Sequence, residues 1–86
     1  MVFDMGKKAD LEIIKQFKQK LSKDIPIYKI ILFGSRARGN AKKFSDFDLI
    51  VVSDNFKGIL RYKRVPKMYD YWNEDYPVDF ICLTKK

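Results

Sequence analysis

The chain has 86 residues, 47% of them hydrophobic and 15% aromatic, which suffices for one small hydrophobic core, so we expect a single domain over residues 1–86. Eighteen lysines and arginines against eleven acidic residues give a net charge of +7, which favours an anionic partner such as a nucleotide, a nucleic acid or an acidic protein. With no histidine and only one cysteine, Cys82, the chain excludes an internal disulfide, zinc sites and Ser-His-Asp or Cys-His catalysis.

The first half of the chain predicts a helix followed by a strand. Apolar residues recur three or four positions apart with lysines between them, which predicts an amphipathic helix over residues 9–22. These apolar residues are Leu11, Ile14, Phe17 and Leu21. The isoleucine-rich residues 28–33 end at Gly34 and predict a buried strand. The small and polar residues 35–43 predict one short helical turn and then a loop.

The second half predicts strand, helix and strand. Residues 46–52 become almost wholly apolar and predict the second strand, whereas the apolar spacing after residue 59 is helical. The helical face contains Leu60 or Arg61, Val65, Met68 or Tyr69, and Trp72, and Pro66 indicates that the helix begins or bends there. Residues 78–83 predict a third strand with Cys82 on its buried side. The fold class is α/β (α+β), with helices on a small mixed sheet of about three strands.

No predicted element is long enough to span a membrane. The longest apolar runs, residues 30–33 and 49–52, are far shorter than the roughly 20 residues that a transmembrane helix needs. The first eight residues lack the apolar stretch of a signal peptide. We therefore expect a protein of the reducing cytoplasm.

Three aspartates occupy strand positions where acids are uncommon. Asp46 and Asp48 lie two positions apart, so both point to one face of the sheet. Asp79 lies within the third apolar strand. Adjacent carboxylates repel and are costly to desolvate unless a proton or a cation neutralises them. The three aspartates therefore predict a magnesium site.

The predicted topology brings these acids to one end of the sheet. A helix-sized crossover joins the second and third strands, and such connections usually link parallel strands. Parallel pairing would bring Asp46, Asp48 and Asp79 together. An antiparallel first strand would carry the Gly34-Ser35 turn to the same end.

The turn has features that suit phosphate binding. Gly34 allows close approach of the backbone, and Ser35 is predicted to cap the short helix, whose N-terminal amides attract anions. Arg36 and Arg38 add positive charge nearby. Together with the acids, the turn predicts transfer from a nucleoside triphosphate between two metal ions about 3.5 to 4 Å apart.

The segment LFGSRARGNAKKFSDFDLIVV resembles the signature of the nucleotidyltransferase superfamily that includes DNA polymerase beta and the kanamycin nucleotidyltransferases. Its elements are Gly34-Ser35, ten intervening residues and Asp46-Phe47-Asp48. The segment PVDFICLT resembles the strand that carries the third carboxylate of that family. The resemblance covers residues 28–84, and the short chain is most similar to the minimal nucleotidyltransferase branch.

The resemblance implies a role for each acid and for the turn. Asp46 and Asp48 would bind two Mg²⁺ ions, and Asp79 would bind the catalytic ion and assist deprotonation of the acceptor hydroxyl. The residues implied in triphosphate binding are Gly34, Ser35 and Arg38, which matches the arginine of the family's S-x-A-R-G run, together with Arg36 at a variable position.

The resemblance also implies a partner. Minimal nucleotidyltransferases are often encoded beside a HEPN-domain protein, usually a ribonuclease toxin, and act as antitoxins by moving AMP from ATP onto a tyrosine of that partner. A toxin–antitoxin pair of this kind is the implied context of the chain.

Several alternatives stay open at this stage. A non-catalytic antitoxin could neutralise its partner by binding, and nucleotidyl transfer to RNA or a small molecule is less favoured, although the charge of +7 keeps RNA among the candidates. Gly34-Ser35 could be an ordinary turn, and Arg36 could be a solvated loop residue. Assembly into a homo-oligomer is open as well. Of the aromatic residues, Tyr71 lies off the helical face and is the better interface candidate.

Overall fold

The computed structural model describes residues 8–39 and 45–85, and their helices and strands follow the predicted order. Residues 40–43 of the predicted loop lie outside the described residues. No helix within the described ranges is long and apolar enough to cross a bilayer. The elements are α1 (Lys8–Ser22), β1 (Lys29–Phe33), α2 (Gly34–Arg38), β2 (Phe47–Val52), the 3-10 helix η1 (Asp54–Phe56), α3 (Arg61–Tyr69) and β3 (Val78–Leu83).

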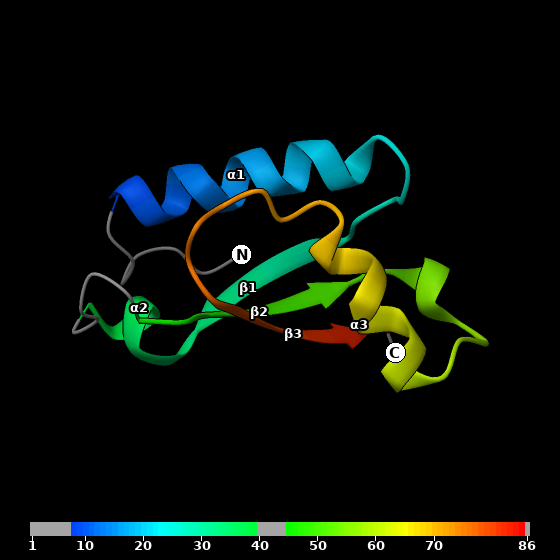
Figure 1. Cartoon of the computed structure of the whole chain (residues 1–86). Coiled ribbons are helices and arrows are strands. Elements are labelled where there is room, and N and C mark those ends of the chain that lie inside the picture. The colour runs from blue at the N-terminus through cyan, green and yellow to red at the C-terminus, as the bar shows by residue number, and fades with distance from the viewer. Residues whose placement is uncertain (1–7, 40–44, 86) are drawn as a thin grey trace.

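Within the described residues, three strands form one mixed sheet in the order β1-β2-β3. β1 is antiparallel to β2, and β3 is parallel to β2 after the crossover through α3, as predicted. Figure 1 shows α1 running across one face of this sheet, with α3 beside the end of β3. The α/β fold class and the mixed sheet are therefore confirmed.

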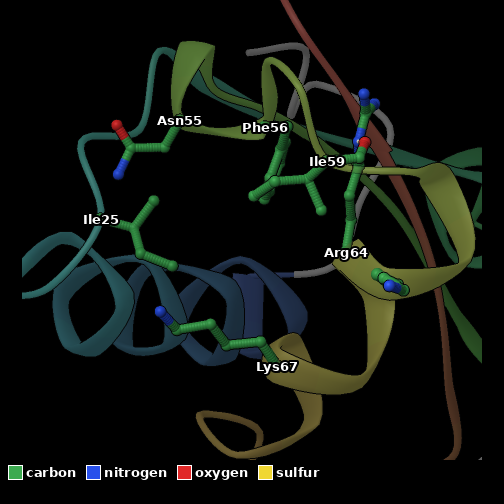
Figure 2. A pocket seen from close by; sticks show the side chains of 7 residues that line it. Ile25, Asn55, Phe56, Ile59, Arg64 and Lys67 are labelled. Atoms are coloured by element: carbon green, nitrogen blue, oxygen red, sulfur yellow. The ribbon is translucent and has the colours of Figure 1, made fainter.

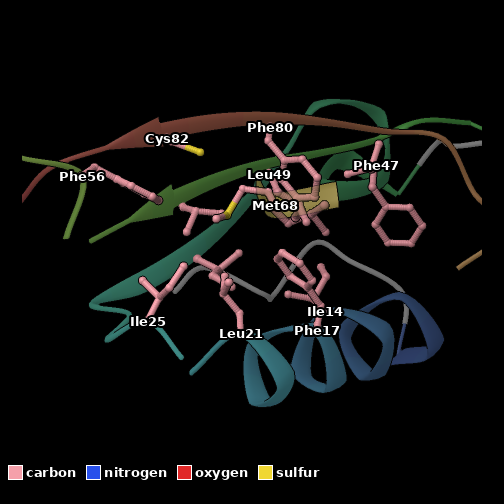
Figure 3. Close-up of a cluster of buried hydrophobic side chains, with 14 residues drawn as sticks. Ile14, Phe17, Leu21, Ile25, Phe47, Leu49, Phe56, Met68, Phe80 and Cys82 are labelled. Atoms are coloured by element: carbon pink, nitrogen blue, oxygen red, sulfur yellow. The ribbon is translucent and has the colours of Figure 1, made fainter. Parts of the chain in front are cut away.

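The hydrophobic core lies between α1 and the sheet (Figure 3). Alternate residues of β2 and β3 point into it, as strand geometry requires. The Phe17 ring of α1 stacks on Phe80 of β3 with 5.4 Å between centroids, and its edge contact with Trp72 is 5.5 Å. Cys82 is buried as predicted, and burial raises the pKa of its thiol to about 11 although the nearby Arg64 lowers it. The thiol therefore stays protonated at neutral pH.

The helix α3 begins earlier than Pro66 indicated. It starts at Arg61 and contains Pro66, which lacks the N–H that would donate to the carbonyl of Tyr62. Met68 is fully buried and Val65 packs against the core, as predicted. Trp72 also packs against the core, but it lies beyond the end of α3, and Leu60 is 59% exposed and precedes the helix, so neither lies on its apolar face. Tyr69, the alternative to Met68, is 46% exposed.

Side chains of α3 and of the segment after it bind neighbouring elements. The hydroxyl of Tyr69 donates to the carbonyl of Val78 at 2.9 Å, so α3 is fixed to β3. The hydroxyl of Tyr71 donates to Asp24 Oδ2 at 2.5 Å, and its ring packs against the core. The chain leaves α3 before Tyr71, and its side chain reaches the turn after α1. The interface role of Tyr71 stays a prediction.

A buried ion pair joins α1 to α2. Asp10 lies on the same helical stripe as the buried residues Ile14, Phe17 and Leu21, and Arg36 Nη1 donates to its Oδ1 at 3.0 Å. Both residues are about 95% buried, and Asp10 Oδ2 has no hydrogen-bond partner within the described part of the chain. An acid in the first turn of a helix ordinarily serves the helix dipole, but here the Asp10 carboxylate neutralises a buried guanidinium.

Arg36 also holds the segments that lead into the central strands. Its Nε donates to the carbonyl of Ser45 at 2.9 Å. Its guanidinium carbon lies 4.2 Å from the ring centroid of Phe47 and 4.9 Å from that of Tyr76. These contacts are close enough for cation–π attraction, so one side chain fixes the approaches to β2 and β3.

We expect Arg36→Met to destabilise the protein by about 3–5 kcal/mol, because it leaves the charge of Asp10 buried without a counter-charge. Urea unfolding measures the loss. The double variant Asp10→Leu, Arg36→Met should recover much of it, since a matched apolar pair has no charge to desolvate. Arg38→Met, at an exposed position, is the control and should change stability by less than about 0.5 kcal/mol. An unfolding midpoint for Arg36→Met equal to that of the control would contradict this account.

Candidate active site

The predicted acids lie at one end of the sheet, as the topology required. Phe33 at the end of β1 is the register partner of Asp48 near the start of β2. Asp48 is in turn the partner of Asp79 on β3. Asp46 precedes Asp48 by two residues and therefore projects to the same side. Because the residues that alternate with these acids point into the core, the carboxylates lie on the sheet face opposite α1.

The electrostatics of Asp48 indicate that the charged side chains of this end influence one another. Its pKa is raised by partial burial first, and then by the carboxylates of Asp79 and Asp46. The guanidinium of Arg38 opposes this shift and lowers the pKa. Asp46, Asp79 and Arg38 are all exposed to solvent. Three acids and one arginine thus form an accessible cluster around Asp48.

Gly34 brings the backbone against this cluster. Its φ of +76° lies in the left-handed region that favours glycine. A Cβ atom at this position would lie 2.2 Å from Asp48 Oδ2, far closer than van der Waals contact allows. Glycine is therefore required at position 34 both by its backbone conformation and by the space that the Asp48 carboxylate takes up.

The structure corrects the predicted role of Ser35 as a helix cap. α2 already begins at Gly34, its N-cap residue is Phe33, and the cap has no side-chain hydrogen bond. Ser35 is the second residue of a helix of only five residues. The strand simply turns into the helix at Gly34, and this turn leaves Ser35 next to the glycine that contacts Asp48.

The two arginines of α2 occupy different environments. Arg38 is exposed and acts electrostatically on Asp48, which agrees with its predicted place near the acids. Arg36 is buried and its guanidinium binds Asp10 and the carbonyl of Ser45. These contacts give Arg36 a structural role and do not support our prediction that it binds nucleotide. The prediction missed Asp10, although an acid on an apolar helical stripe was a signal that could have found this pair.

The chemistry of the site suits a hard divalent cation. Magnesium prefers carboxylate oxygens, and Asp48 lies next to Asp79 across the strand pair with Asp46 two residues away. The described residues contain no group of three acidic, histidine or cysteine side chains arranged to hold a metal ion. The suitability of these residues for a divalent cation therefore rests on their carboxylate oxygens and on the neighbouring acids that raise the pKa of Asp48.

The chain belongs to the family of nucleotidyltransferase domains, whose family model matches residues 13–86. It is 33% identical over 75 residues to "Probable protein adenylyltransferase MntA" of Haemophilus influenzae, which covers 87% of this chain and 63% of that relative. It is 30% identical over 74 residues to a protein of Methanocaldococcus jannaschii that is also named as a protein adenylyltransferase, covering 86% of this chain and 83% of that one. The chain thus spans less than two thirds of the Haemophilus protein.

One solved structure agrees with the family assignment, and another shares only the fold. A crystal structure from Sulfolobus solfataricus, described as a "putative nucleotidyltransferase", has a TM-score of 0.65 and 26% identity, and covers 95% of this chain and 78% of that one. BolA1 of Arabidopsis thaliana has a TM-score of 0.64 with 18% identity, covering 85% and 92% of the two chains. The second likeness is one of fold alone. The minimal nucleotidyltransferase resemblance and the fold that it implied are confirmed.

We expect Gly34→Ala to cost more stability than Gly58→Ala, by about 1 kcal/mol or more. Both glycines have a positive φ, but a Cβ at Gly58 meets no atom within 4 Å. Gly58→Ala therefore measures the backbone cost alone, about 1–2 kcal/mol. In an Asp48→Ala background the extra cost at position 34 should disappear, which urea unfolding of the four variants would measure. Equal costs at Gly34 and Gly58 would contradict the close contact with Asp48.

We expect Asp48→Asn to stabilise the metal-free protein at pH 7 by up to about 1 kcal/mol, a modest gain because water screens the partly exposed charge. The folded pKa of Asp48 is raised above its unfolded value, so its ionisation destabilises the fold as pH rises through that range. Below the unfolded pKa of about 3.9 the carboxyl is protonated in both states and the gain should vanish. Urea unfolding in EDTA at pH 3 and pH 7 tests this.

The control for this experiment is Glu12→Gln on the exposed side of α1, which removes one negative charge away from the cluster. Its stability change should stay within about 0.5 kcal/mol at both pH values. A gain for Asp48→Asn that is the same at pH 3 as at pH 7 would show that the raised pKa does not cause it.

Proposed function

We propose that this domain transfers AMP from ATP to a hydroxyl group of a protein partner and releases pyrophosphate. The observation that carries the proposal is the register that joins Asp48 to Asp79 at the sheet end where Gly34 contacts Asp48. The relatives named as protein adenylyltransferases support a protein acceptor. ATP as the donor follows from the adenylyl group in those names.

We assign the carboxylates to metal binding and proton transfer. Asp46, Asp48 and Asp79 would hold two Mg²⁺ ions, whose positive charge stabilises the negative charge on the transferring phosphate. The acceptor oxygen forms a bond to the α-phosphorus while the bond from that phosphorus to the bridging oxygen breaks. Asp79, which is exposed, accepts the proton of the acceptor hydroxyl, and pyrophosphate leaves.

We assign the turn after β1 to the triphosphate. Gly34 places the turn directly beside the Asp48 carboxylate, so phosphate oxygens bound at the turn would lie close to metal ions held by the acids. Ser35 supplies a hydroxyl beside it, and Arg38 supplies an exposed positive charge. Arg36 is not part of this assignment because it is buried in the ion pair with Asp10.

We further propose that the acceptor belongs to a HEPN-domain toxin and that the chain is its antitoxin. The support for the toxin is the resemblance to minimal nucleotidyltransferases, and the names of the relatives support only a protein acceptor. The acceptor hydroxyl would be the phenol of a tyrosine, which must reach the sheet face that bears Asp48 and Asp79. A partner protein would bring that tyrosine to the exposed acids.

Label from the α-phosphate of ATP, and not from the γ-phosphate, should appear on a discrete protein when the chain is incubated with Mg²⁺ and a lysate of its source organism. Asp48→Asn should lower this transfer more than about 100-fold, as expected for the loss of a preorganised electrostatic contact. Asp70→Asn, an exposed acid after α3, should retain full transfer and controls for the change in charge.

Two results would contradict the proposed function. Full transfer by Asp48→Asn would exclude the carboxylate site. If neither label moves, and the double variant Asp46→Asn, Asp48→Asn still neutralises the toxin, the chain acts by binding alone. Urea unfolding of each variant separates a lost site from a lost fold.

A further inference from the structure

Two pockets flank α3 at the end of the sheet opposite the acids. The first has a volume of about 140 Å³ and lies between α3, η1 and the turn after α1 (Figure 2). Its apolar wall includes Ile25, Phe56 and Ile59, and its basic wall consists of Lys63, Arg64 and Lys67. The second has a volume of about 270 Å³ and is lined by Arg61, Arg64, Leu83 and Thr84.

The charged residues of α3 and of both pocket linings are all basic. The helix sequence RYKRVPKMY contains four cations and no acid. All four cations line one pocket or the other, and the described residues contribute no carboxylate to either lining. Positive charge concentrated on a hollowed surface attracts anions.

Arg64 separates the two pockets and is held in place. Its Nε donates to the carbonyl of Ile59 at 2.7 Å, and its Nη1 donates to the carbonyl of Cys82 at 3.0 Å. The guanidinium carbon is 5.8 Å from the ring centroid of Phe56. Lys63 and Lys67 are exposed and lie four positions apart, which places them next to each other on the helix surface. Lysines of this kind bind phosphates regardless of sequence.

We propose that α3 and its two pockets bind single-stranded nucleic acid. Phosphates would contact Lys63, Lys67 and Arg61, and a base would enter the first pocket against Ile59, whose side chain is 40% exposed. Tyr62 is 70% exposed between Arg61 and Lys63 and offers a second base a ring to stack on. Each nucleotide carries a phosphate and a flat apolar group together, which matches the adjacent basic and apolar walls better than an acidic peptide does.

This site is separate from the proposed active site. Asp79 lies near the start of β3, whereas Leu83 at its end lines the second pocket. Four residues of a strand span roughly 13 Å, so the pockets of α3 lie away from the carboxylates that would hold the metal ions. Binding at α3 therefore requires neither ATP nor magnesium, and it can be measured without them.

The test is the fluorescence anisotropy of a labelled ten-nucleotide RNA of mixed sequence, titrated with the whole chain in EDTA at several salt concentrations. The double variant Lys63→Gln, Lys67→Gln should weaken binding at least about tenfold. It should also make the negative slope of log K against log salt shallower by about 1.4, because each lost phosphate contact accounts for about 0.7. Ile59→Ala should weaken binding several-fold without changing that slope, because it removes an apolar contact and no charge.

The matched control is Lys8→Gln, Lys15→Gln, which removes two exposed lysines of α1 and the same net charge. It should change the affinity less than twofold. Equal weakening by both double variants, or no binding by the unmodified chain at 50 mM salt, would overturn the proposal. Displacement of the RNA by oligoglutamate at equal charge concentration would also overturn it and would point to an acidic protein. Circular dichroism verifies that each variant is folded.

Discussion

The buried guanidinium of Arg36 is the interaction on which the arrangement of this domain depends. It neutralises Asp10 of α1, binds the carbonyl of Ser45 and packs on Phe47 and Tyr76. Ser45 and Phe47 flank Asp46, and Tyr76 leads into the strand that bears Asp79. The Arg36 charge must stay paired because it is buried. Its contacts therefore fix the starts of β2 and β3, which carry the acids on the opposite face of the sheet.

On the opposite face of the sheet, at the starts of the same strands, the constraint is the crowding of charge around Asp48. Partial burial and two neighbouring carboxylates raise the pKa of Asp48, and Gly34 brings the backbone against its oxygen. The charged form of Asp48 is therefore unfavourable for the isolated fold. If the proposed function is right, stability and metal binding make opposite demands on this carboxylate.

Charge is divided between the two ends of the sheet. The three aspartates lie where β2 and β3 start, whereas the cations of α3 lie beside the pockets near the strand ends. The net charge of +7 alone did not distinguish a nucleotide from a nucleic acid. In our proposals this division gives each ligand its own surface, with a magnesium-bound triphosphate at the carboxylates and a single-stranded nucleic acid at α3.

The sequence by itself determined the order of the main elements and the meeting of Asp48 with Asp79, because apolar periodicity and the crossover rule depend on local spacing. It determined the family through a resemblance of the Gly34-Ser35 and Asp46-Phe47-Asp48 motifs. Only the tertiary structure decided the partner of Arg36, the start of α2 at Gly34 and the position of Tyr71. Arg36 lies 26 residues from Asp10. Such contacts depend on which surfaces meet when α1 packs on the sheet, and the burial that selects them exists only in the folded chain.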